Sequence, residues 1–203
     1  MERVSQRPVL NVADLPTVVF GPRNVVWLGT VFFMAIEGTA IAMLYACYFY
    51  YRTRSSDWPP GVMPPYLKWG VLNGIVFLVS LAPAWWIRKR ARAADVAGCR
   101  LGLVLLAIFG VGSIVLRVYE FAGLNCDWTA NAYASTVWTL MGMHSAHLLT
   151  DFIETAVLAV LAFTDRVDGL RFTDFDENSM YWYFVVGVAV VTDFVVYGAS
   201  RLF

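Results

Sequence analysis

The sequence predicts an all-α membrane protein in which five transmembrane helices form a bundle. Of the 203 residues, 59% are hydrophobic and only 15% are charged, and the mean hydropathy of +0.61 is far above that of an ordinary soluble domain. Five stretches also reach the ~20 mostly apolar residues that a helix needs to cross a bilayer. We therefore expect a single membrane domain over residues 1–203, with phospholipid around it.

The elements follow one another with clear punctuation. The first twenty residues contain two prolines and no continuous apolar run, so we expect residues 1–24 to form a cytoplasmic segment without a cleavable signal peptide. The predicted spans then lie at about 25–51, 66–87, 98–121, 132–163 and 180–202. The stretch SSDWPPGVMPP separates the first two spans, and LNCDWTANAYAS separates the third from the fourth.

The basic residues beside the spans predict the orientation. Ten Lys and Arg residues flank the side that holds the N-terminus and the RKRAR run at 88–92, and four flank the other side. Because cytoplasmic loops are enriched in these residues, we expect the N-terminus inside and the C-terminus outside. Tryptophans near the predicted span ends fit an interfacial aromatic belt: Trp58, Trp69, Trp85, Trp86, Trp128 and Trp182.

Several kinds of site are disfavoured by the sequence. The three cysteines, Cys47, Cys99 and Cys126, show neither CxxC nor Cys/His spacing, so we expect them to pack rather than to bind metal. No nucleophile triad, phosphate-binding glycine loop or nucleotide fingerprint is present. Basic and acidic residues balance at 15 each, which gives no indication of a nucleic-acid partner.

Within the predicted spans, eight ionisable residues are candidates for groups at membrane depth. Such groups cost at least ~2.5–3.5 kcal/mol each on insertion scales, so they usually face a bundle interior, pair with one another or serve function. This intramembrane polar set is Glu37, Arg117, Glu120, His144, His147, Asp151, Glu154 and Asp193. Arg117 and Glu120 are three residues apart, so they can pair on one helix face in a mainly structural role.

Four members of this set lie close together in MHSAHLLTDFIETAVL, the stretch from Met143 to Leu158. On a helix, His144, His147, Asp151 and Glu154 fall within an arc of about 80°, so they form one polar stripe. A stripe of this kind cannot face lipid, and we expect it to turn toward Glu37 at similar depth.

The residues alone leave three interpretations of the stripe open. It can be a hydrogen-bonded seam between helices, a proton relay, or a metal site formed by Glu37, His144, His147, Asp151 and Glu154. A bis-histidine haem is disfavoured because both histidines share one helix face.

The motifs together resemble the subunit III family of haem–copper oxidases, in its short five-helix bacterial form. FFMAIEGTAIAMLYACYFYYR followed by WPPG is similar to the family's first helix, and RVYEF resembles a later helix that ends in an aromatic-flanked glutamate. HSAH matches the HGxH of the penultimate helix, and FDENSMYWYFVV resembles the opening of the last one. The resemblance covers roughly residues 20–203.

The resemblance implies a non-catalytic accessory subunit of a terminal oxidase in a bacterial or archaeal cell membrane. Haem and copper are then expected in the catalytic partner subunit, with no cofactor in this chain. Family members stabilise that partner, hold lipid in a cleft between helix groups, and support oxygen and proton delivery. Glu37, Glu120, His144 and His147 fall on matching family positions. A nitric oxide reductase or another respiratory complex is the alternative parent complex, and a membrane metalloprotein the alternative function.

The chain also departs from the family pattern. The family usually has glycine at the position of Asp151 and an apolar residue at that of Glu154. Its last helix normally contains WHFVD, where this chain has Tyr183 and Val186 in place of the histidine and the aspartate. Asp193 matches no motif. Acidic groups are therefore shifted from the last span to the fourth. In a non-catalytic subunit, Asp151 or Glu154 is expected to stay protonated unless it pairs with a protonated histidine.

Overall fold

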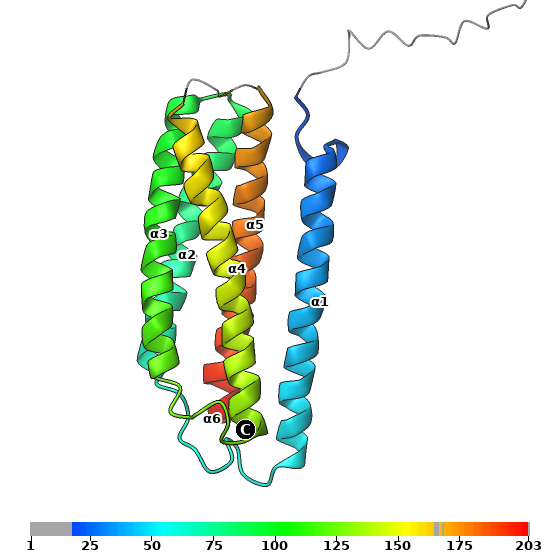
Figure 1. Cartoon of the computed structure of the whole chain (residues 1–203), viewed down its shortest axis with the longest axis vertical. Helices are drawn as coiled ribbons and strands as arrows, with labels where there is room; N and C mark the ends of the chain where they lie inside the picture. The colour runs from blue at the N-terminus through cyan, green and yellow to red at the C-terminus, as the bar shows by residue number, and fades with distance from the viewer. Residues whose placement is uncertain (1–17, 165–166, 168, 203) are drawn as a thin grey trace, which may run out of the picture.

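The computed structural model describes residues 18–164, 167 and 169–202, and it is entirely helical or irregular over that part of the chain. Five of its helices are long and apolar enough to cross a membrane, and Figure 1 shows how they are arranged. They are α1 (Val25–Arg54), α2 (Leu67–Arg92), α3 (Val96–Ala122), α4 (Ala132–Ala162) and α5 (Gly169–Asp193). A π-helical segment, η2 (Phe194–Ala199), and α6 (Ser200–Leu202) continue α5, and a 3₁₀ turn, η1 (Gly21–Arg23), precedes α1. The prediction of a multi-pass helical protein is confirmed.

Polar side chains define where three of the helices begin. The side chains of Asn24, Asp95 and Asn131 accept hydrogen bonds from the backbone N–H groups of Val26, Gly98 and Ala134, at the starts of α1, α3 and α4. Each cap satisfies one of the N–H groups that the first helical turn leaves without a partner. The predicted starts of the first and fourth spans coincide with the first helical residues after these caps, and that of the third lies two residues after the start of α3.

The last helix begins at Gly169, well before the start predicted near residue 180. The run FTDFDENSM reads as too polar for a span, but its acidic residues have partners that the sequence does not reveal. Asp176 accepts hydrogen bonds from Arg88 and Arg92 at the end of α2, so this charged turn is helical and packed. Trp182 therefore lies inside the bundle, fully buried against Ser80, and the prediction that it belongs to an interfacial belt is wrong.

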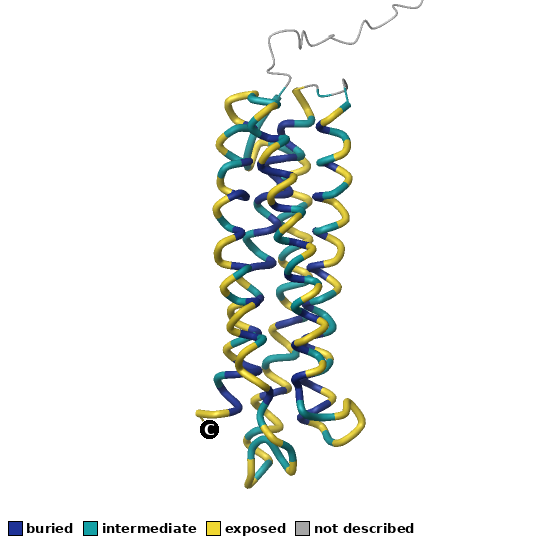
Figure 2. The backbone as a smooth tube through the Cα atoms, turned by 90° about the vertical axis from the view of Figure 1, so that its left-hand side faces the viewer, coloured by how far each residue is buried: buried dark blue, intermediate teal, exposed yellow. Residues whose placement is uncertain are grey.

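Four helices form the compact part of the molecule, and α1 lies beside them. α2 packs against α3 and α5, and α4 packs against the same two helices. α1 packs mainly against the outer side of α4 and α5, and its first half diverges from them (Figure 1). Buried residues follow the inner faces of the helices, while the outer faces are exposed (Figure 2). In a bilayer, those exposed apolar faces are available to lipid or to partner subunits.

Two further sequence predictions concern the N-terminal segment and the cysteines. The predicted cytoplasmic segment 1–24 falls largely on residues 1–17, which lie outside the described residues. The three cysteines are unpaired, and their burial differs. Cys99 is buried in the core, as the packing interpretation requires, whereas Cys47 is exposed on the outer surface of α1.

Candidate functional site

A polar group lies inside the four-helix part of the bundle, and we call it the inner network. It consists of Asn73, Arg117, Glu120, His144 and Tyr197. Arg117 Nη1 lies 3.0 Å from Glu120 Oε2, which also accepts a 2.8 Å hydrogen bond from Asn73 Nδ2. The Tyr197 hydroxyl donates to the other carboxylate oxygen at 3.2 Å. The ion pair expected from the spacing of Arg117 and Glu120 is thus present, and it connects α2, α3 and η2.

His144 completes the inner network with both of its ring nitrogens. Nδ1 is 2.8 Å from Arg117 Nη2, and Nε2 is 3.0 Å from the carbonyl oxygen of Val185. A guanidinium can only donate and a carbonyl can only accept, so Nδ1 accepts and Nε2–H donates. The imidazole is therefore neutral, and neither nitrogen is left to bind a metal. His144 connects α3, α4 and α5.

A second polar group joins α1 to the rest of the bundle, and we call it the Glu37 cluster. It consists of Glu37, His147 and Tyr181. The Tyr181 hydroxyl donates a 2.6 Å hydrogen bond to Glu37 Oε2, and His147 Nε2 lies 3.3 Å from Oε1. The side chains of Glu37 and His147 are only 11% and 8% exposed. The polar stripe of α4 thus reaches Glu37, as the sequence predicts. Of the two histidines, His147 makes this contact and His144 does not.

Asp151 and Glu154 continue the stripe along α4 in different surroundings. Asp151 is fully buried, and within the described part of the chain neither of its carboxyl oxygens has a hydrogen-bond partner. It lies one helical turn from His147 and within electrostatic range of Glu37 and Glu154. A buried carboxyl group without a partner is strongly disfavoured as an anion, so Asp151 is a candidate proton-holding group.

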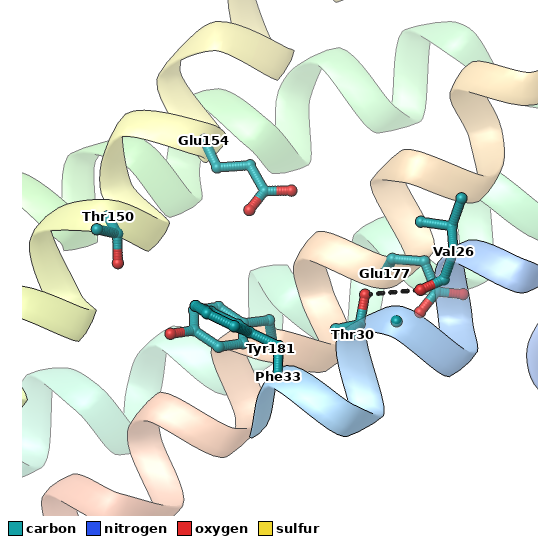
Figure 3. Close-up of a pocket in the computed structure, with 8 residues that line it drawn as sticks. Val26, Thr30, Phe33, Thr150, Glu154, Glu177 and Tyr181 are labelled. Atoms are coloured by element: carbon teal, nitrogen blue, oxygen red, sulfur yellow. Dashed lines mark hydrogen bonds between the residues drawn. The ribbon is translucent and has the colours of Figure 1, made fainter. Parts of the chain in front are cut away.

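Glu154 faces a cleft of about 490 Å³ between α1, α4 and α5. In Figure 3 its carboxylate points into the open space between the helices, with Thr150 beside it on α4 and Tyr181 across the cleft on α5. The full lining is Val26, Gly29, Thr30, Phe33, Thr150, Glu154, Glu177 and Tyr181. Tyr181, which lines the cleft, also donates a hydrogen bond to Glu37, so the cleft borders on the Glu37 cluster. Val26, Thr30, Phe33 and Glu37 share one face of α1, and this face is turned toward the cleft.

The last member of the polar set, Asp193, ends α5 at the junction with η2. It lines a separate, mostly apolar hollow between α2 and the end of α5. Its Oδ1 has no hydrogen-bond partner among the described residues. A single π-helical turn is a frequent feature of functional or strained positions, and here it directs the side chain of Tyr197 toward Glu120.

The structure separates the residues of the predicted metal site. His144 belongs to the inner network, whereas His147 contacts Glu37 on the opposite side of the stripe. In the part of the chain that the structure describes, no three imidazole, thiol or carboxyl groups meet as an ion would require. The geometry instead favours the seam and relay interpretations.

Several functional candidates were not identified from the sequence. Asn73 had a usable signal, because it is a lone amide inside the apolar run GVLNGIVF. Tyr181 and Tyr197 have no such signal, since tyrosines near the ends of a predicted span are ordinary interfacial residues. Glu177 lies outside the last span that the sequence predicts, so the sequence gives no indication of its position in the cleft.

The chain is similar in sequence to several known proteins. No protein-family model matches the chain. It is 27% identical to the cytochrome c oxidase subunit 3 of Synechocystis sp. over 176 residues, which is 83% of this chain and 73% of that protein. It is 26% identical to the probable cytochrome c oxidase subunit 3 of Mycobacterium tuberculosis over 178 residues, covering 86% and 88% of the two chains. The cytochrome c oxidase subunit 3 of Corynebacterium diphtheriae is 25% identical, with 80% and 82% covered.

These similarities, at 25–27% identity over most of the chain, support a divergent member of the cytochrome c oxidase subunit III family. The resemblance that the motifs indicate is therefore confirmed. Among the residues at family-type positions, Glu120 and His144 lie in the inner network, and Glu37 and His147 lie in the Glu37 cluster. The two acids that depart from the subunit III pattern, Asp151 and Glu154, lie between that cluster and the cleft.

Proposed function

We propose that the chain is a non-catalytic, subunit III-like component of a respiratory haem–copper terminal oxidase. The observation that supports this most strongly is similarity to proteins named cytochrome c oxidase subunit 3 over at least 80% of the chain. Haem and copper then belong to the catalytic partner subunit, and this chain contributes no cofactor. Its polar groups are suited to holding helices together and to handling protons rather than to redox chemistry.

The first role is to stabilise the catalytic subunit by packing against it in a bacterial or archaeal cell membrane. Large apolar side chains are exposed along the outer faces of α1, α2 and α3, including Phe32, Ile36, Leu78 and Ile108. Faces of this kind need lipid or another subunit beside them. The excess of Lys and Arg at one end supports a cytoplasmic N-terminus and an external C-terminus, which reporter fusions at the two ends can test.

The second role is proton delivery through the cleft. Glu154 and Glu177 lie at the cleft wall, and Tyr181 and Glu37 lie where it ends. Asp151 stands between these groups on α4, so carboxyl and hydroxyl groups follow one another from the cleft into the bundle. Chains of acidic groups and histidines are the usual means of moving protons at membrane depth. The same cleft, with Val26 and Phe33 in its wall, has the size and apolar lining to hold a lipid chain.

The third role, oxygen delivery, is supported by an apolar hollow of about 410 Å³ between α3 and α4. Its wall is formed by side chains such as Ile108, Val111, Phe152 and Ala156. Cavities with such linings accept small apolar molecules without hydrogen-bond loss. A hollow on the lipid-facing side is therefore suited to concentrating oxygen near the complex.

Affinity purification tests the proposal. The full chain with a C-terminal tag, extracted from native membranes in a mild detergent, should retain a haem–copper catalytic subunit. Oxygen consumption by the purified material supports an oxidase, whereas consumption of nitric oxide without oxygen consumption assigns the chain to a nitric oxide reductase. A chain that purifies alone with bound metal contradicts the proposed role.

A further inference from the structure

A second hollow lies on the other side of α5 from the cleft. It has a volume of about 480 Å³ and is lined by Trp85, Arg88, Lys89, Arg92 and Tyr183. The four α2 residues recur at three- and four-residue intervals, so they form one strip at the C-terminal end of that helix. Tyr183 is two residues beyond Tyr181 on α5, which turns it away from the cleft and toward this strip.

The cations of this strip are held in place. Arg88 Nε and Arg92 Nε each lie 3.1 Å from Asp176 Oδ1, and Asp176 is almost completely buried. The Arg88 guanidinium also lies 5.6 Å from the centre of the Tyr183 ring. Two guanidinium groups therefore share one carboxylate, which fixes their Nε atoms and leaves positive charge in excess.

Lys89 differs from the two arginines. Its ammonium group lies 5.2 Å from the centre of the Trp85 ring, and among the described residues it has no carboxylate partner. Three cations thus surround the hollow, and only one carboxylate, that of Asp176, pairs with them. Glu177, next to Asp176 in the chain, lies within electrostatic range of both arginines, so within the described ranges the charge of the hollow that is left without an acidic partner is that of Lys89.

Topology alone accounts for only part of this arrangement. Basic residues are expected beside the cytoplasmic end of a span and near a helix C-terminus. Neither rule requires the cations to line one hollow, to be oriented by a buried aspartate, or to lie over aromatic rings, as Arg88 does over Tyr183 and Lys89 over Trp85. Trp85 and Tyr183 are the residue types that settle at the headgroup level of a bilayer, so the hollow has the chemistry of a headgroup site.

We propose that this hollow binds the headgroup of an anionic phospholipid. Its phosphate accepts hydrogen bonds from Lys89 and the arginine guanidinium groups, and its glycerol and upper acyl chains pack on Trp85 and Tyr183. Basic hollows between helices at the membrane surface are suited to such headgroups. The site is distinct from the cleft, and it rests on the proposed function only in requiring that the chain lies in a bilayer.

Lipid titration of the full chain in mild detergent, followed by native mass spectrometry, tests the site. We expect phosphatidylglycerol to bind more tightly than phosphatidylcholine. Because a lysine near an anionic surface contributes about 1 kcal/mol, Lys89→Gln should weaken phosphatidylglycerol binding about fivefold, and Lys89→Arg should restore it. Lys68→Gln is the matched control, because Lys68 lies over Trp69 at the opposite end of α2.

The outcomes separate the possible occupants. Equal binding of the two lipids, or equal losses in Lys89→Gln and Lys68→Gln, overturns the proposal. Displacement of phosphatidylglycerol by millimolar inorganic phosphate also overturns it, because the site then recognises phosphate without the lipid. Cross-linking of residue 89 to another subunit in the native complex, with no lipid retained there, assigns the hollow to protein docking. The titration needs no partner subunit, so its result is independent of the affinity purification.

Discussion

The hydroxyl of Tyr181 on α5 lies 2.6 Å from Oε2 of Glu37 on α1. The other oxygen of that carboxyl group is 3.3 Å from His147 on α4, so one side chain of α1 joins three helices. α1 is the most exposed of the five spans, and it packs mainly against α4 and α5 among the other spanning helices. The Glu37 cluster is therefore one polar link that holds α1 against the bundle beside the cleft, together with the 2.7 Å hydrogen bond between the hydroxyl groups of Tyr45 and Thr192.

Tyr181→Phe should lower the stability of the folded chain. The substitution removes the donor to Glu37 and leaves a mostly buried carboxyl oxygen without it, which costs about 1–3 kcal/mol. Unfolding in sodium dodecyl sulfate measures the change. Tyr119→Phe is the control, because Tyr119 is exposed and stacks on Trp69 through its ring. Equal stabilities of the two variants would show that the hydroxyl does not hold α1.

Arg117→Met should be more damaging than Tyr181→Phe. Glu120 then loses its counter-charge and His144 loses a donor, and an uncompensated buried charge costs about 3–5 kcal/mol. Adding Glu120→Gln to Arg117→Met should recover a large part of that loss, because no charge then remains unpaired. The double-mutant cycle measures this coupling. Additive effects of the two substitutions would contradict the inner network as described.

Asp151 should be protonated in the folded protein. It is buried with no hydrogen-bond partner among the described residues, which disfavours the anion. Infrared spectra should therefore show a protonated-carboxyl band that Asp151→Asn removes. Asp174→Asn is the control, because Asp174 is partly exposed and pairs with Arg171. An unchanged band in Asp151→Asn means that Asp151 is ionised and paired, which would argue against its role as a proton-holding group.

Gly70→Ala should destabilise the end of the bundle at which the start of α2 packs against η2. A Cβ atom at Gly70 would overlap the ring of Tyr197, whose hydroxyl donates to Glu120. Overpacking of this kind costs about 1–3 kcal/mol. Gly112→Ala is the matched control on α3, where a Cβ meets nothing within 4 Å, and the alanine should stabilise the helix by about 0.5–1 kcal/mol. Opposite signs in an unfolding experiment are expected, and a neutral Gly70→Ala would contradict the packing.

The spans could be predicted because apolar length, proline-rich loops and polar caps are all local features of the sequence. The start of α5 could not, because its acidic turn is stabilised by Asp176 and two arginines almost ninety positions earlier in the chain. Its span looked too polar only while these partners were unknown. The misplacement of Trp182 has the same origin, since a longer helix moves that residue into the core.

The candidate site was predictable only in part, because local periodicity determines which residues share a helix face but not which neighbouring helix each residue contacts. Helical periodicity places His144, His147, Asp151 and Glu154 on one stripe, and it also predicts the approach to Glu37. Periodicity does not show that His144 turns toward Arg117 while His147 turns toward α1. That division depends on which helices pack on either side of α4, and it separates a structural histidine from one beside the cleft.

The most direct test of the central claim is the haem content of material purified through the tagged full chain. A reduced-minus-oxidised absorbance spectrum, together with quantification of each subunit, should show haem in a fixed ratio to this chain and a haem–copper catalytic subunit beside it. The same ratio should persist through a second chromatographic step. Homogeneous chain without haem or catalytic subunit, from membranes that contain an active terminal oxidase, would contradict the proposal.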